Sequence, residues 1–175
     1  MARIAATLLL AMFLAGPSTA QEEQEVNAVF EALDKMDFLV GAWRTESTFV
    51  PGGGVMIGDL EYRRALGGWW IMVDFCGRLP DGSENRLHGL YTYFPEEGCY
   101  RLYGFGGSNQ TFTLTGRWAD DERLVFASDA TGDDGKPLSR IIYIKMAEGV
   151  RQENDRLGPD GEYEMTLRTS YERRD

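Results

Sequence analysis

The stretch EYEMTLRTSYE, residues 162–172, carries the clearest pattern in the chain, because its odd-numbered side chains are all uncharged and its charged side chains all stand at even-numbered positions. The uncharged positions that share one face are Tyr163, Met165, Leu167, Thr169 and Tyr171. Successive side chains of a β-strand point to opposite faces, so this spacing predicts a strand with one face in a core. The even-numbered positions from Leu138 to Met146 alternate in a similar way and predict another strand.

Turn-forming residues recur at short intervals along the chain. The nine clusters lie at 51–54, 67–68, 80–82, 95–98, 106–109, 120–121, 132–135, 148–149 and 158–161. Such clusters of Gly, Pro, Asn and Asp predict turns, and nine turns separate ten strands. No connection is long enough for a crossover helix, so consecutive strands should pair antiparallel. Because closing the sheet removes its edges, we expect an all-β, up-and-down antiparallel barrel of about ten strands.

One short amphipathic helix is expected before the barrel. Apolar residues follow helical spacing at Val26, Val29, Phe30, Leu33 and Met36, after a polar lead at residues 21–25. The length of the chain fits a single folded domain. We therefore assign residues 21–40 to the polar lead and a helix that closes one end, and residues 41–175 to the barrel.

Residues 1–20 have the three parts of a secretory signal peptide. Arg3 gives a positive start, an apolar run extends from Ile4 to Ala15, and Ser18-Thr19-Ala20 forms a small-residue cleavage site. The alternative is a membrane anchor, but a run of this length reaches only about 18 Å as a helix, short of the roughly 30 Å hydrocarbon core. We expect a periplasmic or secreted protein with no membrane insertion after the signal is removed.

The net charge bears on binding to nucleic acid, and the two cysteines bear on whether a disulfide forms. The formal net charge of −10, from 18 basic and 28 acidic residues, disfavours binding to nucleic acid. An exported protein meets an oxidising compartment, so a disulfide between Cys76 and Cys99 must be considered. The expected strands place these two residues at opposite ends of the barrel, which favours two buried small apolar residues instead.

Four short motifs carry a family resemblance. They are MDFLVGAW at 36–43, LGGWW at 66–70, GLYTY at 89–93 and SYER at 170–173. Together they resemble an uncharacterised family of bacterial proteins, known only as a domain of unknown function, with a lipocalin-like or calycin-type barrel. The resemblance covers nearly all of the chain after the signal. It implies a fold and supplies no catalytic residue, since that family has no established activity.

Gly41-Ala42-Trp43 is also similar to the opening signature of lipocalins and of the haem-binding nitrobindin-type barrels. In those barrels the Trp closes one end, often packed beneath an Arg from the last strand. The resemblance implies a barrel-closing stack of Trp43 and Arg173, held by cation–π attraction. The alternative is that Trp43 is an ordinary core residue and Arg173 a solvated residue of the tail.

Nitrobindin-type barrels ligate haem iron through a histidine late in the chain. The single histidine here is His88, in mid-chain, and residues 163–173 contain none, so we expect no haem. One His and two distant Cys do not make a zinc ligand set. We therefore predict no cofactor and no metal.

The aromatic content, with four Trp, eight Tyr and nine Phe, suits either a lined cavity or a filled core. We favour a cavity. The candidate ligand-binding wall residues are Trp43, Tyr62, Trp70, Asp74, Tyr91 and Trp118. Asp74 shares the parity of Trp70, and an inward carboxylate would be suited to proton transfer, which makes Asp74 the candidate catalytic residue.

Three functions are compatible with these residues. The first is an exported barrel that binds a small apolar or amphipathic molecule. The second is a small-molecule enzyme of isomerase or cyclase type that uses an inward carboxylate or Tyr. The third is a structural or interaction module of the cell envelope, which an exposed apolar patch on the barrel wall would support. The sequence leaves the identity of the ligand and the oligomeric state open.

Overall fold

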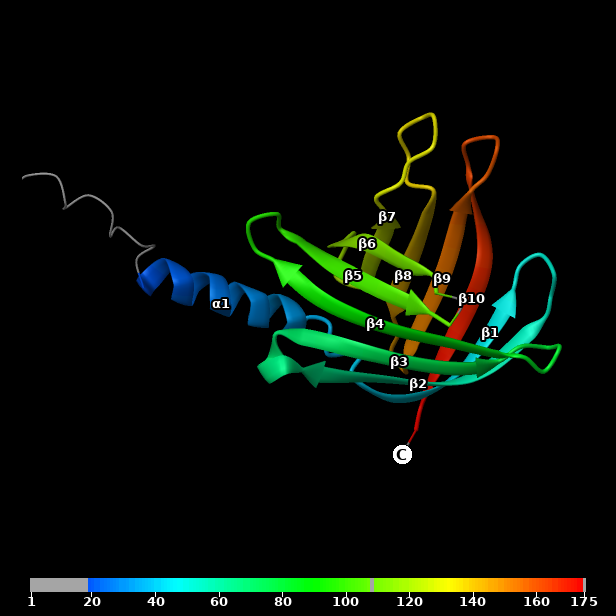
Figure 1. Ribbon diagram of the computed structural model, residues 1–175, viewed down its shortest axis with the longest axis horizontal. Helices are drawn as coiled ribbons and strands as arrows, with labels where there is room; N and C mark the ends of the chain where they lie inside the picture. The colour runs from blue at the N-terminus through cyan, green and yellow to red at the C-terminus, as the bar shows by residue number, and fades with distance from the viewer. Residues whose placement is uncertain (1–18, 108, 175) are drawn as a thin grey trace, which may run out of the picture.

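The computed structural model describes residues 19–107 and 109–174 and shows a closed antiparallel barrel (Figure 1). One helix, α1 (Thr19–Asp34), precedes it. The strands are β1 (Gly41–Phe49), β2 (Val55–Ala65), β3 (Trp70–Arg78), β4 (Glu84–Phe94), β5 (Cys99–Gly106), β6 (Thr111–Trp118), β7 (Arg123–Ser128), β8 (Ser139–Lys145), β9 (Val150–Leu157) and β10 (Tyr163–Arg173), with a short 3-10 turn, η1 (Leu66–Gly68), between β2 and β3. Each strand pairs with its neighbours in sequence, and β1 pairs with β10 to close the barrel.

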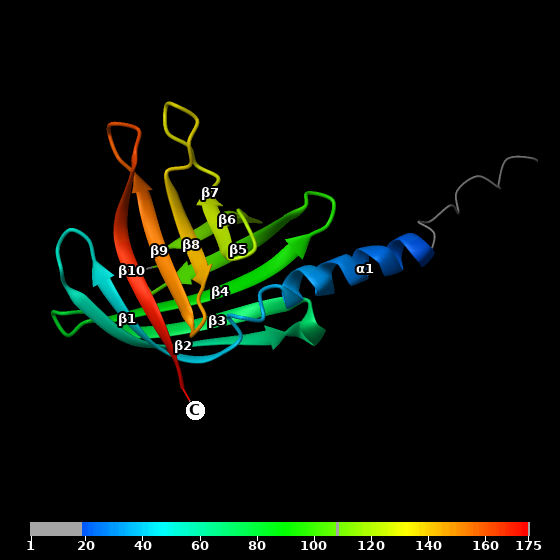
Figure 2. The same ribbon diagram turned by 180° about the vertical axis from the view of Figure 1, so that it is seen from behind.

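This topology confirms the predicted up-and-down barrel of ten strands. Each of the nine predicted turn clusters falls at a connection between consecutive strands. The hairpins between β7 and β8 and between β9 and β10 rise above one rim of the barrel (Figures 1 and 2). No helix among the described residues is long and apolar enough to cross a membrane. Most of the predicted signal peptide, residues 1–18, lies outside the described residues.

Helix α1 begins earlier than the apolar spacing indicates, because it includes the polar lead at residues 21–25. Its first half extends away from the barrel (Figure 1), and its second half buries Val29 and Leu33. The turns that follow α1 bury Met36 and Leu39 against the same core. Helix and turns thus close one end of the barrel, which we call the closed end.

Two backbone carbonyls fix this closure. The hydroxyl of Tyr100 donates a hydrogen bond to the carbonyl of Ala32 at 2.8 Å, and the indole N–H of Trp43 donates to the carbonyl of Leu39 at 2.7 Å. Both donors are buried, so each bond satisfies a carbonyl that burial would otherwise leave unpaired.

Glycines inside the barrel make room for aromatic rings. A Cβ on Gly104 would lie 2.1 Å from the ring of Phe112, and one on Gly116 would lie 2.4 Å from the ring of Phe126. Both rings therefore lie directly against strand backbone, which only a residue without a side chain allows. The bulge in the sheet is elsewhere, between Met165 and Leu167 of β10.

That bulge divides the stretch that dominated the sequence pattern. Leu167 pairs with Asn154 on the inner face of β9, whereas Met165 pairs with Asp155 on the outer face. The extra residue therefore reverses the alternation, and Met165 does not share the face of Thr169 and Tyr171 as predicted.

The strand predicted at 138–146 is confirmed as β8, whereas the prediction that both cysteines are buried was wrong. Strand β8 turns its odd-numbered residues inward, including buried Tyr143, so the even-numbered positions from Leu138 to Met146 face outward. Cys99 is buried, but Cys76 is exposed on the outer face of β3, and the two thiols are free. Cys76 is exposed because β3 buries its odd-numbered residues.

Candidate functional site

Four tyrosines from four strands meet inside the barrel above the closed end. Tyr62 (β2), Tyr91 (β4), Tyr143 (β8) and Tyr171 (β10) form this tyrosine quartet, and each is at most 6% exposed. The hydroxyls of Tyr91 and Tyr143 are 2.8 Å apart, and the hydroxyl of Tyr62 lies 3.4 Å from those of both Tyr143 and Tyr171. The quartet therefore fills the middle of the barrel and pairs its own polar atoms.

Burial raises the pKa of every phenol in the quartet. For Tyr62, Tyr91 and Tyr171 the pKa lies well above its usual value of 10, chiefly because the ionised form would lose its hydration. The pKa of Tyr143 is raised for the same reason. The four phenols are neutral at physiological pH, as any ordinary phenol is, and burial extends this neutral state to more alkaline pH.

A chain of hydrogen bonds leads from the quartet toward the opposite end. The hydroxyl of Tyr171 donates to the side-chain oxygen of Gln152 on β9. The amide nitrogen of Gln152 in turn donates to the side-chain oxygen of Asn154 at 2.7 Å. Gln152 and Asn154 share the inner face of β9, because their partners on β8 are Tyr143 and Ile141.

Asn154 lines a cavity of about 780 Å³ at the end of the barrel away from α1, which we call the open end. Here β6 continues to Thr111 beyond its last pair with β7, Leu114 with Ser128, so the wall opens beside β6, and the lining includes residues from both faces of β8 and β9. The apolar lining consists of Phe112, Leu114, Ala130, Leu138 and Ile141. The polar lining consists of Thr113, Ser128, Asp129, Ser139, Arg140, Asn154, Asp155, Arg156 and Thr166.

The two carboxylates of this lining already have partners. Asp155 accepts a 2.7 Å hydrogen bond from Arg140, whose guanidinium lies 3.9 Å above the ring of Tyr163. Asp129 accepts a hydrogen bond from Thr115 at 2.7 Å and pairs with Arg101 at 3.3 Å. Both carboxylates therefore form part of the rim and are not free to bind a cation.

The six predicted wall residues lie in two places, and none of them lines the cavity. Trp43, Tyr62 and Tyr91 are buried inside the barrel, and Trp118 is partly buried beside Tyr100. The stack expected between Trp43 and Arg173 is present, with the guanidinium 4.5 Å from the centre of the ring. These residues pack the closed end and the middle of the barrel.

The other two wall residues, Trp70 and Asp74, face outward, so the expectation of an inward Asp74 carboxylate was wrong. The Asp74 carboxylate accepts a hydrogen bond from Arg63 at 3.0 Å and also contacts the ring of His88 on the outer wall. Trp70 packs against Tyr103, with ring centres 6.2 Å apart. The parity argument failed because both faces of β3 carry apolar residues.

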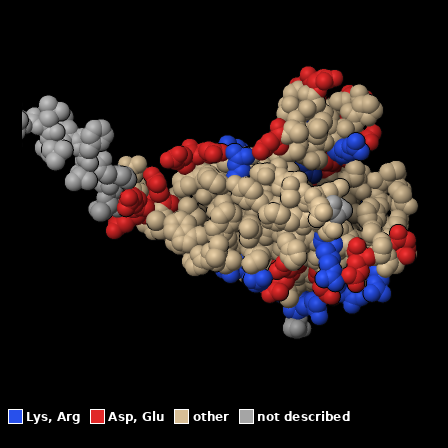
Figure 3. Space-filling view, in the orientation of Figure 1, with Lys and Arg blue, Asp and Glu red and all other residues tan. Residues whose placement is uncertain are grey.

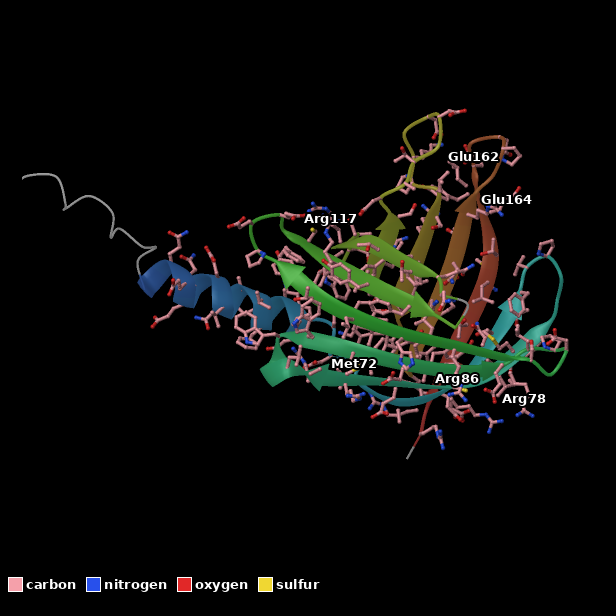
Figure 4. All side chains as sticks on the ribbon, viewed as in Figure 1. Met72, Arg78, Arg86, Arg117, Glu162 and Glu164 are labelled. Atoms are coloured by element: carbon pink, nitrogen blue, oxygen red, sulfur yellow. The ribbon has the colours of Figure 1, made fainter. Side chains whose placement is uncertain are left out.

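The outer wall around Trp70 is one of the less charged faces of the protein. Figure 3 shows a broad uncharged surface over the front strands, with charged side chains gathered along its margins. The side chains of Met72, Leu90 and Tyr103 on this wall are only partly exposed. Figure 4 places Met72 on this wall and Glu162 and Glu164 at the hairpin above the open end.

Sequence reasoning missed the residues that line the cavity. Asn154 and Arg156 stand in a polar segment, VRQENDRL at 150–157, that carries no apolar alternation.

Among the described residues, no group of three or more His, Cys, Asp or Glu side chains is arranged to hold a metal ion.

Comparisons with known proteins add information about the fold. No protein-family model matches the chain, and no curated protein matches it. Among solved structures, the chain is similar to Rv2717c from M. tuberculosis, with 14% identity, 82% of this chain and 98% of that chain covered, and a TM-score of 0.61. This likeness supports the barrel fold, and at this identity it shows nothing about activity.

Designed barrels also match, at lower structural similarity. A redesigned β barrel, mFAP0, bound to DFHBI shares 12% identity over 78% of this chain and 99% of that chain, with a TM-score of 0.41. A fluorescence-activating β barrel designed de novo shares 14% identity over 81% of this chain and 98% of that chain, also with a TM-score of 0.41. The resemblance to nitrobindin-type barrels stays a prediction.

Proposed function

We propose that this protein binds a small amphipathic molecule in the cavity at the open end of the barrel. The cavity itself carries the proposal, because its volume of about 780 Å³ lies within the range of roughly 300–1,000 Å³ that small-molecule sites occupy. Apolar side chains such as Phe112 and Ile141 would hold the body of the ligand, and the amide of Asn154 would orient a polar group.

The packing below the cavity supports binding rather than turnover. A site for catalysis needs a group that can gain or lose a proton at the reacting atom. The two lining carboxylates are engaged by Arg140 and Arg101, Asp74 lies outside the barrel, and the quartet phenols are held neutral by burial. The cavity therefore offers shape and hydrogen bonds, which suit a carrier.

The test is a binding titration with N-phenylnaphthylamine, an apolar dye that fluoresces when it leaves water. We expect saturable binding to the full chain. The variant Ser139→Phe places a ring in the cavity and should weaken dye binding by at least about tenfold. The matched variant Ser170→Phe adds the same ring to the exposed outer face of β10 and should leave binding unchanged. Equal effects of the two variants, or no saturable binding, would exclude this cavity as the site.

We further propose that the protein is exported, on the basis of the signal-like segment at residues 1–20. The first residue of the protein isolated from its native host is then expected to be Gln21. An isolated chain that still begins at Met1 would contradict export by this signal.

A further inference from the structure

The charged side chains that line the cavity are two carboxylates, Asp129 and Asp155, and two arginines, Arg140 and Arg156. Asp155 is paired with Arg140 of the neighbouring strand β8, and Asp129 is paired with Arg101 of β5, which also pairs with Glu97. Arg156 also lines the cavity, but it takes part in none of the ion pairs or side-chain hydrogen bonds formed by the described residues. Arg156 is therefore the charged group of the lining that has no side-chain partner among the described residues.

Glu164 is the carboxylate that faces Arg156 across the β9–β10 ladder. The two side chains form no ion pair within 4 Å among the described residues. The Glu164 carboxylate instead lies against the turn at Gly158, 3.2 Å from where a Cβ at that glycine would stand. The guanidinium of Arg156 is thus left to pair with a ligand.

Arg156 and Asn154 project from the same face of β9, two residues apart. Such positions are separated by about 7 Å along a strand, and a long and a short side chain there can reach one group between them. The side-chain oxygen of Asn154 already accepts a hydrogen bond from Gln152. Its amide N–H₂ therefore remains to donate, and the hydrogen-bonded chain from Tyr171 through Gln152 polarises it in that direction.

We infer that the ligand, if the proposed function holds, is an apolar monocarboxylate. Its two carboxylate oxygens would accept hydrogen bonds from the Asn154 amide and the Arg156 guanidinium, a pairing that planar anions make well. Its apolar body would pack against Phe112, Leu114 and Ile141. A single unmatched cation suits one negative charge, and the net charge of −10 disfavours a polyanion.

The experiment compares three competitors of equal chain length that displace N-phenylnaphthylamine: decanoate, decanol and decylamine. The full chain should prefer decanoate over decanol by about fivefold, because Arg156 is exposed and an exposed charge pair contributes at most about 1 kcal/mol. Arg156→Gln should remove most of that preference and leave decanol affinity unchanged. Arg168→Gln removes an exposed arginine from the outer face of β10 and serves as the matched control, with no expected change.

Asn154→Asp provides a second variant of almost the same shape. A carboxylate in place of the donor should repel decanoate and favour decylamine, so the order of the competitors should reverse. Equal displacement by decanoate and decanol, or a preference for decylamine in the unaltered chain, would overturn the carboxylate inference while leaving the cavity as a binding site. Failure of the dye to bind would instead overturn the proposed function itself.

Discussion

The closed end and the open end of this barrel use inner positions of the same strands in opposite ways. On β8, Tyr143 fills the interior beside Phe126, whereas Ser139, four residues away on the same face, lines the cavity. On β9, Val150 is buried near the closed end, whereas Asn154 and Arg156 open onto the cavity. The pairing of β9 with β8 and with β10 runs through both regions, so on these strands the difference lies in the side chains.

This contrast indicates that the closed end contributes mainly to stability, whereas the open end contributes mainly space. Large side chains near the closed end exclude water and hold the strands together, which is where burial stabilises a fold most. Small and polar side chains at the open end forgo that stabilisation and leave space for another molecule. Natural proteins commonly accept such local losses at their functional sites. The predictions below test whether stability and binding separate in this way.

The largest expected effect is a loss of stability in alkaline solution, caused by the tyrosine quartet. Below pH 10 its phenols are protonated in both the folded and the unfolded chain, so their contribution is constant. Above pH 10 the unfolded chain releases these protons at the usual pKa, whereas burial keeps the folded pKa values higher. The unfolded state is therefore favoured as pH rises, by about 1.4 kcal/mol per phenol at pH 11 for Tyr62, Tyr91 and Tyr171, or about 4 kcal/mol for the three, and Tyr143, whose pKa is also raised, adds to this loss.

Urea unfolding at intervals from pH 8 to pH 11 measures this effect. Absorbance at 295 nm, recorded in parallel, reports phenol ionisation, and the quartet should ionise only as the chain unfolds. A free energy of unfolding that stays level up to pH 11, with all phenols ionised in the folded state, would show that water reaches the interior. The contrast between the two ends would then fail.

The next largest effect compares one phenylalanine from each end. Phe126 is fully buried and packs edge-on against Tyr91 and Tyr143, so Phe126→Ala should lower the free energy of unfolding by about 3–5 kcal/mol. Phe112 is only partly buried and already borders the cavity. Phe112→Ala should cost less than half as much in stability, yet weaken the binding of N-phenylnaphthylamine.

Urea unfolding and dye titration of both variants give the comparison. Equal losses of stability would mean that the open end is packed as firmly as the closed end. A larger loss of dye binding in Phe126→Ala than in Phe112→Ala would place the binding space at the wrong end of the barrel.

The sequence predicted the framework of the barrel because turn chemistry is local. Clusters such as residues 80–82 and 158–161 mark connections whatever the rest of the chain does, so strand number and order followed. The stack of Trp43 and Arg173 could also be predicted, because the first and last strands of a closed up-and-down barrel must pair.

The open end was not predictable from the same signals, because its features depend on register. The bulge between Met165 and Leu167 moves Met165 to the outer face although the sequence alternates unbroken there, and Ser139 gives no sign in the sequence of facing inward. Asp74 was misplaced because both faces of β3 carry apolar side chains. The wall opens where β6 continues past its last pair with β7, Leu114 with Ser128, and how far two strands stay paired is not visible in composition.

The smallest expected effect concerns the stack that fastens the closed end. Arg173→Gln removes the cation over Trp43 but leaves the ring buried, so we expect a loss of about 0.5–1 kcal/mol and a shift in Trp fluorescence. Arg174→Gln is the neighbouring control, because Arg174 forms only an exposed pair with Asp59 that should contribute little. If both variants lowered the free energy of unfolding by the same amount, the stack would contribute no more than an exposed ion pair. Trp43 would then be held only by its hydrogen bond to Leu39 and by burial. If only Arg173→Gln lowers the free energy of unfolding, and dye binding is unchanged, the stack at the closed end contributes to stability and not to binding in the cavity.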